Sequence, residues 1–364
     1  MDNRRSTTLG CVQGTLGRAF DPRRNSLNAL RLLLATLVIV SHSWPIGGYG
    51  DDPGIGDLSL GEWAVAGFFA ISGYLITMSR VRSRSFGDYL WRRVLRIYPA
   101  FLVVLVVVAF AFAPLSVVVS GEGTWTVGEA ATYVVRNLGL RVTQMGIPGT
   151  LEGVPYADAW NGSLWTLWYE FLCYLVLGVA VTLLPERWVG PATIGAAVAC
   201  PAAVILIIAA GVPSLALLNA VTLGGYFAAG AVLFSYRDRV PMRGWLAAAS
   251  AVLIVVAAMT STFRGIAGFP VAYLMLWLGV ALPLSAVGAK NDLSYGMYVY
   301  AFPVQQMLAI VLAGVVLPPA VFVMLTIAAT VPFAAASWFL VEKPAMRLKS
   351  LRWGRRRPAT PPPQ

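Results

Sequence analysis

The stretch LRLLLATLVIVSHSW, residues 30–44, predicts the first membrane-spanning helix and carries two ionisable side chains within it. These are Arg31 and His42, and His42 is the only histidine among the 364 residues of the chain. They are eleven positions apart, about three helical turns, so both side chains share one helix face, roughly 16 Å apart along the axis. Because ionisable groups are expensive to hold in hydrocarbon, their presence usually indicates a functional site.

The composition of the chain places it among polytopic membrane proteins of the all-α class. Hydrophobic residues make up 58% and charged residues 12%, against about 45–50% and 25% in soluble domains. The three cysteines have no paired spacing and there is one histidine, so we expect neither a disulfide framework nor a metal site. The net charge of +11 comes from basic residues between the apolar runs, which indicates membrane topology rather than a nucleic-acid partner.

Ten apolar runs predict a transmembrane bundle of about ten helices. If the N-terminus lies inside and the spans alternate, all 27 Lys and Arg residues except Arg136, Arg141 and Arg264 fall on the inner side. This bias predicts that both termini are cytoplasmic. The predicted spans are residues 28–47, 61–79, 97–120, 163–184, 190–211, 216–236, 244–260, 268–288, 295–315 and 318–341.

The chain divides into three predicted parts. Residues 1–27 form a basic cytoplasmic N-terminal segment, residues 28–345 the membrane domain, and residues 346–364 a basic, Pro-rich cytoplasmic tail. The largest outer loop runs from about 121 to 162, and within it the segment 128–140 predicts an interfacial amphipathic helix. No cleavable signal peptide is evident before the first apolar run.

His42 is the first candidate catalytic residue. It lies about 14 residues into an outward-going span, which places it in the outer half of the membrane. A neutral imidazole can take a proton from a hydroxyl and return it to a leaving group near pH 7. The competing interpretation is an interhelical hydrogen bond that only stabilises the bundle.

Two further segments contain polar residues near the membrane. In FFAISGYLIT, residues 68–77, Gly73 and the preceding Gly67 favour close helix packing, and Ser72 places a hydroxyl at mid-depth. In LWRRVLRIYP, residues 90–99, Arg93 and Arg96 share a helix face and suit phosphate groups. The alternative for these arginines is a topology signal without a ligand.

Two late segments supply a carboxylate and a group of aromatic side chains. NGSLWTLWYE, residues 161–170, places Glu170 inside a span, where it needs a partner such as His42 or a cation. Its alternative role is a structural ion pair. LSYGMYVYAFPVQQ, residues 293–306, supplies tyrosine hydroxyls and rings that otherwise serve packing.

Together these segments resemble acyltransferase family 3, the integral-membrane O-acyltransferases of surface glycans, lipids or small metabolites. The resemblance covers residues 28 to about 345. The arginine and histidine of the family's first span match Arg31 and His42. Four further family elements match in order: Phe68 to Ile76, Arg93 with Arg96, Trp165 to Glu170, and Ser294 to Pro303. A VEKP at residues 341–344 resembles the end of the last family helix. Many members have a histidine where this chain has Ala301, so a mechanism with two histidines is not expected.

The resemblance implies acyl transfer, most commonly of acetyl, from cytoplasmic acyl-CoA to an acceptor hydroxyl in a bacterial cytoplasmic (inner) membrane. Acyl-CoA is then a co-substrate, and no permanently bound cofactor is expected. We expect His42 to act as general base, although a transient acyl-histidine is a second route. Arg93 and Arg96 are expected to bind the donor, which then passes Arg31, a residue counted with both the catalytic and the donor-binding groups. Glu170 is expected to orient His42. Ser72, Trp165 and Tyr298 are expected to form the pocket.

The main alternative is a transporter or flippase for lipids or glycans, which would also need intramembrane charges. The inverted repeats and broken helix pairs common in such proteins are not evident here. The acceptor stays open between saccharides, glycolipids and small metabolites, and neither the acyl chain length nor the oligomeric state follows from the sequence.

Overall fold

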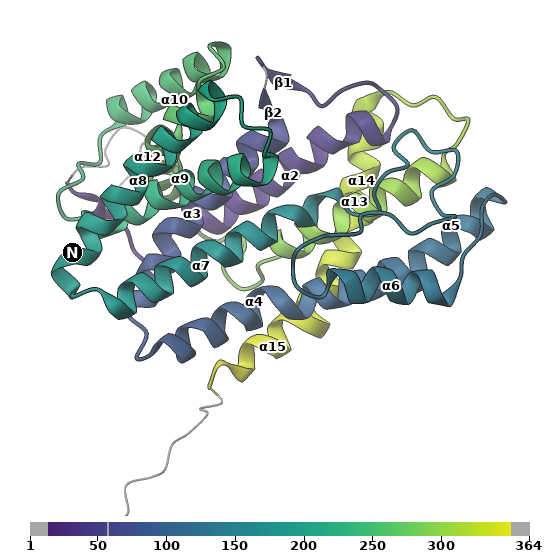
Figure 1. Ribbon diagram of the computed structural model, residues 1–364, viewed down its shortest axis with the longest axis horizontal. Helices are drawn as coiled ribbons and strands as arrows, with labels where there is room; N and C mark the ends of the chain where they lie inside the picture. The colour runs from purple at the N-terminus through teal and green to yellow at the C-terminus, as the bar shows by residue number, and fades with distance from the viewer. Residues whose placement is uncertain (1–13, 57, 351–364) are drawn as a thin grey trace, which may run out of the picture.

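Seven helical segments are long and apolar enough to cross a membrane in the computed structural model, which describes residues 14–56 and 58–350 (Figure 1). Two of them contain a short π-helical segment, η1 (Val108–Phe112) or η3 (Ser337–Glu342). The seven segments are α2 (Leu27–Ile46), α3 (Leu60–Val81), α4 to α5 (Phe86–Val107 and Ala113–Ser120), η2 with α7 (Gly162–Leu164 and Trp165–Leu183), α8 (Glu186–Ala209), α9 (Leu215–Ser235), and α14 to α15 (Pro319–Ala336 and Lys343–Arg347).

Helices also occupy the three remaining predicted ranges. α10 (Gly244–Met259) and α12 (Gly268–Ala281) have 16 and 14 residues, fewer than the roughly 20 that span a bilayer without tilt or thinning. α13 (Ser294–Val311) has 18 residues, and 14 of them are buried in the bundle. The prediction of a transmembrane helix bundle is therefore confirmed, while the number of ten spans stays a prediction.

Short elements complete the architecture. α6 (Val127–Asn137) confirms a helix in the predicted amphipathic segment, and its Tyr133 is buried. A β-hairpin with two residues in each strand, β1 (Gly54–Ile55) and β2 (Leu58–Ser59), was not predicted, because strands this short have no alternating pattern. α11 (Phe263–Ile266) lies between α10 and α12, and η4 (Leu348–Ser350) follows α15.

The segment before the first span packs against the bundle. α1 (Leu16–Ala19) buries Leu16 and is followed by the buried Phe20, whose ring meets that of Tyr74 in α3. Thr15 forms an isolated bridge with Pro241, which ties this segment to the α9–α10 connection. Most of the predicted C-terminal tail, residues 351–364, and residues 1–13 lie outside the described chain.

α3 occupies the centre of the bundle and packs directly on α9 through two glycines. A Cβ atom at Gly73 would collide with the backbone carbonyl of Phe227, and one at Gly230 with the carbonyl of Ala70. α2 covers another face of α3, and α13 in turn packs on α2 (Figure 1). The close-packing role predicted for the glycine of the 68–77 segment is therefore confirmed at Gly73.

We expect Gly73→Ala to lower the free energy of unfolding by about 1–3 kcal/mol, because the added methyl group forces α3 and α9 apart. Gly195→Ala in α8 is the matched control, since no atom lies within 4 Å of its added Cβ, and it should be neutral or slightly stabilising. Unfolding of both variants in the same detergent measures the difference. Equal behaviour of the two would contradict the close approach.

Candidate active site

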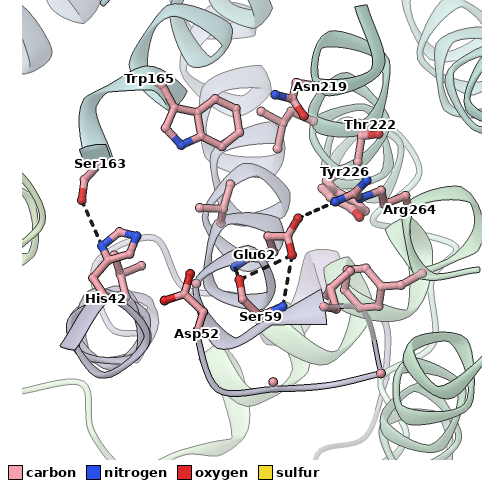
Figure 2. A pocket seen from close by; sticks show the side chains of 18 of the residues that line it. His42, Asp52, Ser59, Glu62, Ser163, Trp165, Asn219, Thr222, Tyr226 and Arg264 are labelled. Carbon is pink, nitrogen blue, oxygen red and sulfur yellow. Dashed lines mark hydrogen bonds and ion pairs between the residues drawn. The ribbon is translucent and has the colours of Figure 1, made fainter. Parts of the chain in front are cut away.

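His42 lies near the end of α2 and is held by residues from two other helices. Its Nδ1 is 3.4 Å from the hydroxyl of Ser163 in η2, at the start of α7. The ring of Phe302, in α13, packs edge-on against the imidazole with the centroids 5.1 Å apart. Figure 2 shows the second ring nitrogen on the side away from Ser163. If Nδ1 carries the proton, the lone pair of Nε2 is free to accept another.

A cavity of about 690 Å³ lies in front of the imidazole. Trp165 and Tyr298, both predicted to line a pocket, line this cavity together with His42. Figure 2 shows Trp165 and His42 on its walls. The Tyr298 hydroxyl donates to the backbone oxygen of Ser163 at 2.6 Å and lies 2.6 Å from Thr166 Oγ1. Tyr298 therefore holds the turn that presents Ser163 to the imidazole.

Glu170 and Ser72 meet each other rather than His42. The Ser72 hydroxyl donates to Glu170 Oε1 at 2.9 Å, and the Tyr174 hydroxyl donates to the same oxygen at 2.5 Å. Neither Glu170 nor Ser72 is among the residues that line the His42 cavity. The orienting contact expected from Glu170 is thus replaced by Ser163, because Glu170 lies about two helical turns further along α7.

Acidic residues that the motif analysis missed line the same cavity. Asp51 and Asp52 come from the loop after α2, and Glu62 lies in the first turn of α3. Burial raises the pKa of the Asp52 carboxyl, as do the charges of Glu62 and Asp51, against a hydrogen bond from Ser41 that lowers it. Glu62 pairs with Arg264 at 2.6 Å. For Asp51 and Asp52, the available signal was a pair of acidic residues in the short loop after the helix of His42.

α9 also contributes polar residues that the sequence analysis did not single out. Asn219, Thr222 and Tyr226 line the cavity on the side opposite His42 (Figure 2). An asparagine and a threonine three residues apart in an otherwise apolar span were the available signal.

Arg31 and Arg96 converge on one carboxylate, Asp292, in the loop before α13. Asp292 Oδ2 accepts from Arg31 at 3.0 Å and from Arg96 at 2.6 Å, while Oδ1 accepts from the Ser294 hydroxyl at 2.6 Å. Arg96 also pairs with Glu342 at 3.2 Å. Burial alone would raise the pKa of the Asp292 carboxyl, but the two guanidiniums and the Ser294 hydrogen bonds hold it well below its usual range.

The arginine network does not line the His42 cavity. Arg31 pairs with Asp292 in the loop before α13, and His42 packs on Phe302 of α13. Both residues of the predicted shared helix face therefore contact the same neighbouring segment. Of the two arginines expected to hold phosphates, Arg96 is engaged by carboxylates, whereas Arg93 has a 3.4 Å contact with Ser79 and a buried Nε without a partner among the described residues. Their role in donor binding stays a prediction.

Lys349 adds a further positive charge beside these arginines. It lies in η4, whose neighbouring Leu348 accepts a hydrogen bond from Trp91 of α4 at 3.3 Å. Burial and the charges of Arg93, Arg96 and Arg92 lower the pKa of Lys349 to about 8. Cations that repel one another in this way favour a bound anion. No group of three or more His, Cys, Asp or Glu placed to hold a metal ion occurs in residues 14–56 and 58–350.

Comparison with known proteins gives two relatives and one family. The model of acyltransferase family 3, described as an acyltransferase domain, matches residues 24–339. An O-acetyl transferase of Shigella phage Sf6 is 32% identical over 355 residues, which cover 88% of this chain and 96% of the phage protein. Nodulation protein 10 of Rhizobium leguminosarum bv. viciae is 29% identical over an alignment of 370 positions, which covers 92% of this chain and 96% of that protein. No solved structure matches the chain significantly.

We expect Asp292→Ala to lower the free energy of unfolding by about 3–5 kcal/mol, because it leaves two largely buried guanidiniums facing each other, of which only Arg96 keeps a carboxylate, Glu342. Asp88→Ala is the control, since it removes a half-exposed i,i+4 pair with Arg92 that should contribute about 1 kcal/mol or less. Unfolding of the purified variants in detergent tests the difference. Equal losses would show that Asp292 does not stabilise the bundle as described.

Proposed function

The chain belongs to acyltransferase family 3 and is an O-acyltransferase, and from this premise we propose that it transfers an acyl group from acyl-CoA to a hydroxyl of a saccharide or other acceptor. The name of the phage relative favours acetyl as that group. The observation that carries the proposal is the position of His42 in the wall of a 690 Å³ cavity, with Ser163 on one ring nitrogen. The transporter interpretation does not account for the family match.

His42 acts as the general base in this proposal. Nε2 takes the proton of the acceptor hydroxyl while the hydroxyl oxygen attacks the thioester carbonyl carbon. The C–S bond then breaks, and the imidazolium returns the proton to the departing thiolate, so that the products are the acyl ester and free CoA. Ser163 and Phe302 fix the ring, which keeps Nε2 directed at the cavity.

The two polar regions lie on opposite sides of the membrane in this proposal. Most polar groups of the cavity come from segments that ten alternating spans place at the outer side: the loop with Asp52, the starts of α3, α7 and α9, and α11. Tyr298 reaches the cavity from within α13. Those of the arginine network come from the inner ends of α2, α4, α13 and α14. That residues assigned to one side by alternation lie together supports ten alternating spans. The positive-inside bias then places both termini in the cytoplasm, and we propose a bacterial inner membrane as the location.

The donor binds through its charged end on the inner side in this proposal. Arg93 and Lys349 supply charge beside Arg96, and a phosphate would relieve the repulsion that lowers the pKa of Lys349. The slender pantetheine arm then extends past Arg31 towards His42, a length of roughly 16 Å along α2. The acceptor enters from the outer side, where Asp51 and Asp52 border the cavity.

Replacement of His42 by Ala should lower acetyl transfer by about 10²–10⁴-fold, the usual contribution of a general base. The assay uses purified protein in lipid nanodiscs, radiolabelled acetyl-CoA and a panel of methyl glycosides. The affinity for acetyl-CoA should not change, because its charged end binds elsewhere. Transfer at the wild-type rate by His42→Ala would refute both the general-base and the acyl-histidine routes.

The affinity for acetyl-CoA should fall severalfold between pH 7 and about pH 9, as Lys349 loses its proton. The sign follows from the lowered pKa of about 8: below it the lysine is charged and attracts phosphate, and above it binding requires the uptake of a proton. Lys349→Arg keeps the charge at both pH values and should remove the dependence. Calorimetric titration measures both proteins. An identical pH profile in the two would exclude Lys349 from the donor site.

A further inference from the structure

One face of α9 brings three polar side chains to the cavity. Asn219, Thr222 and Tyr226, here named the α9 polar row, occupy positions i, i+3 and i+7 and therefore share one face of the helix. Figure 2 shows them across the cavity from His42, with Trp165 between the two sides. Tyr226 lies eleven residues after the first residue of α9, about 16 Å along the helix.

The α9 polar row has no hydrogen-bond partner within the described chain. The Thr222 residue is 7% exposed, and its hydroxyl is buried and unpaired. Tyr226 is 4% exposed, and neither its hydroxyl nor the Asn219 amide bonds to a residue within 14–56 or 58–350. Unpaired polar groups inside a membrane bundle are costly. The buried, unpaired Thr222 hydroxyl, beside the Tyr226 hydroxyl and the half-buried Asn219 amide on one cavity wall, therefore favours a bound group that pairs with this row.

Other hydroxyls of the bundle behave differently. Ser235, on the same helix, donates to the carbonyl of Ala231 one turn earlier, and Thr77 in α3 donates to Gly73 in the same way. This local bond is the usual solution for Ser and Thr inside apolar helices. Thr222 does not make it, although it is in a regular helix, so its buried hydroxyl keeps both its donor and its acceptor unused among the described residues.

The charges around the cavity favour an uncharged occupant. Asp51, Asp52 and Glu62 contribute carboxylates, and the one cation among the lining residues, Arg264, pairs with Glu62 at 2.6 Å. An anionic group would need free charged donors and would meet three carboxylates. Neutral hydroxyls fit better, because they donate to carboxylates and both donate to and accept from the hydroxyls and the amide of the α9 polar row.

We propose that the α9 polar row is a subsite for an uncharged, hydroxyl-bearing ring of the acceptor, which it holds while a hydroxyl of that ring or of its neighbour faces His42. The inference rests on the proposed function, because it places the acceptor in the cavity of His42. Trp165 and Phe263 supply the apolar walls of the subsite. Selection against anionic acceptors follows from Asp51, Asp52 and Glu62.

The test compares Thr222→Val and Tyr226→Phe with the wild type in nanodiscs. Transfer from acetyl-CoA is measured to a methyl hexopyranoside and to the corresponding methyl hexuronide, together with the melting temperature and the affinity for acetyl-CoA. We expect transfer to the neutral glycoside to exceed transfer to the uronide. In each variant the KM for the neutral glycoside should rise about fivefold with little change in kcat, as for the loss of one hydrogen bond. The melting temperature should stay equal or rise, since an unpaired hydroxyl is removed.

Thr326→Val in α14 is the matched control, because its hydroxyl is also buried and unpaired but does not line the cavity. It should keep or raise the melting temperature and leave the KM unchanged. An unchanged KM in both test variants, a fall in their melting temperature, equal or better transfer to the uronide, or transfer to neither glycoside would overturn the subsite. Failure of the proposed function differs, because the wild type would then neither bind acetyl-CoA nor consume its thioester.

Discussion

Polar groups inside an apolar helix bundle must find partners, and this constraint arranges both functional regions of the protein. At one end, Asp292 joins the guanidiniums of Arg31 and Arg96 and so ties α2, α4 and the start of α13 together. At the other end, Ser163 and Tyr298 hold the turn beside His42. α2 and α13 run between the two regions and carry residues of both, so the position of the imidazole depends on the same helix pair as the arginine network.

The sequence predicted the helices well, because each apolar run is long and bounded by polar or turn residues. Helices occur at all ten predicted ranges, and the predicted amphipathic segment forms α6. The β1–β2 hairpin could not be predicted, since two residues per strand carry no period. The burial of Leu16 in the N-terminal segment was equally hidden, because a four-residue helix has no recognisable pattern.

The candidate site was predicted in part, and the missing part has a physical reason. His42, Trp165 and Tyr298 lie on one cavity, as their motifs indicate. Glu170 was expected beside His42, but it bonds Ser72 and Tyr174 instead, because it lies about two helical turns further along α7 than Ser163. Asn219 and Thr222 lie on a span without a recognised motif. The packing of α9 on α3 and its other neighbours brings them to the cavity.

The central claim is that the donor is held on the inner side while the acceptor hydroxyl meets His42 from the outer side. Membrane vesicles of defined orientation test it directly, because acetyl-CoA does not cross a lipid bilayer. Supplied to the outside of sealed vesicles, it should be consumed by inside-out vesicles that contain a methyl glycoside acceptor in their lumen, and not by right-side-out vesicles. Equal consumption by both orientations, or consumption by right-side-out vesicles alone, would contradict the account.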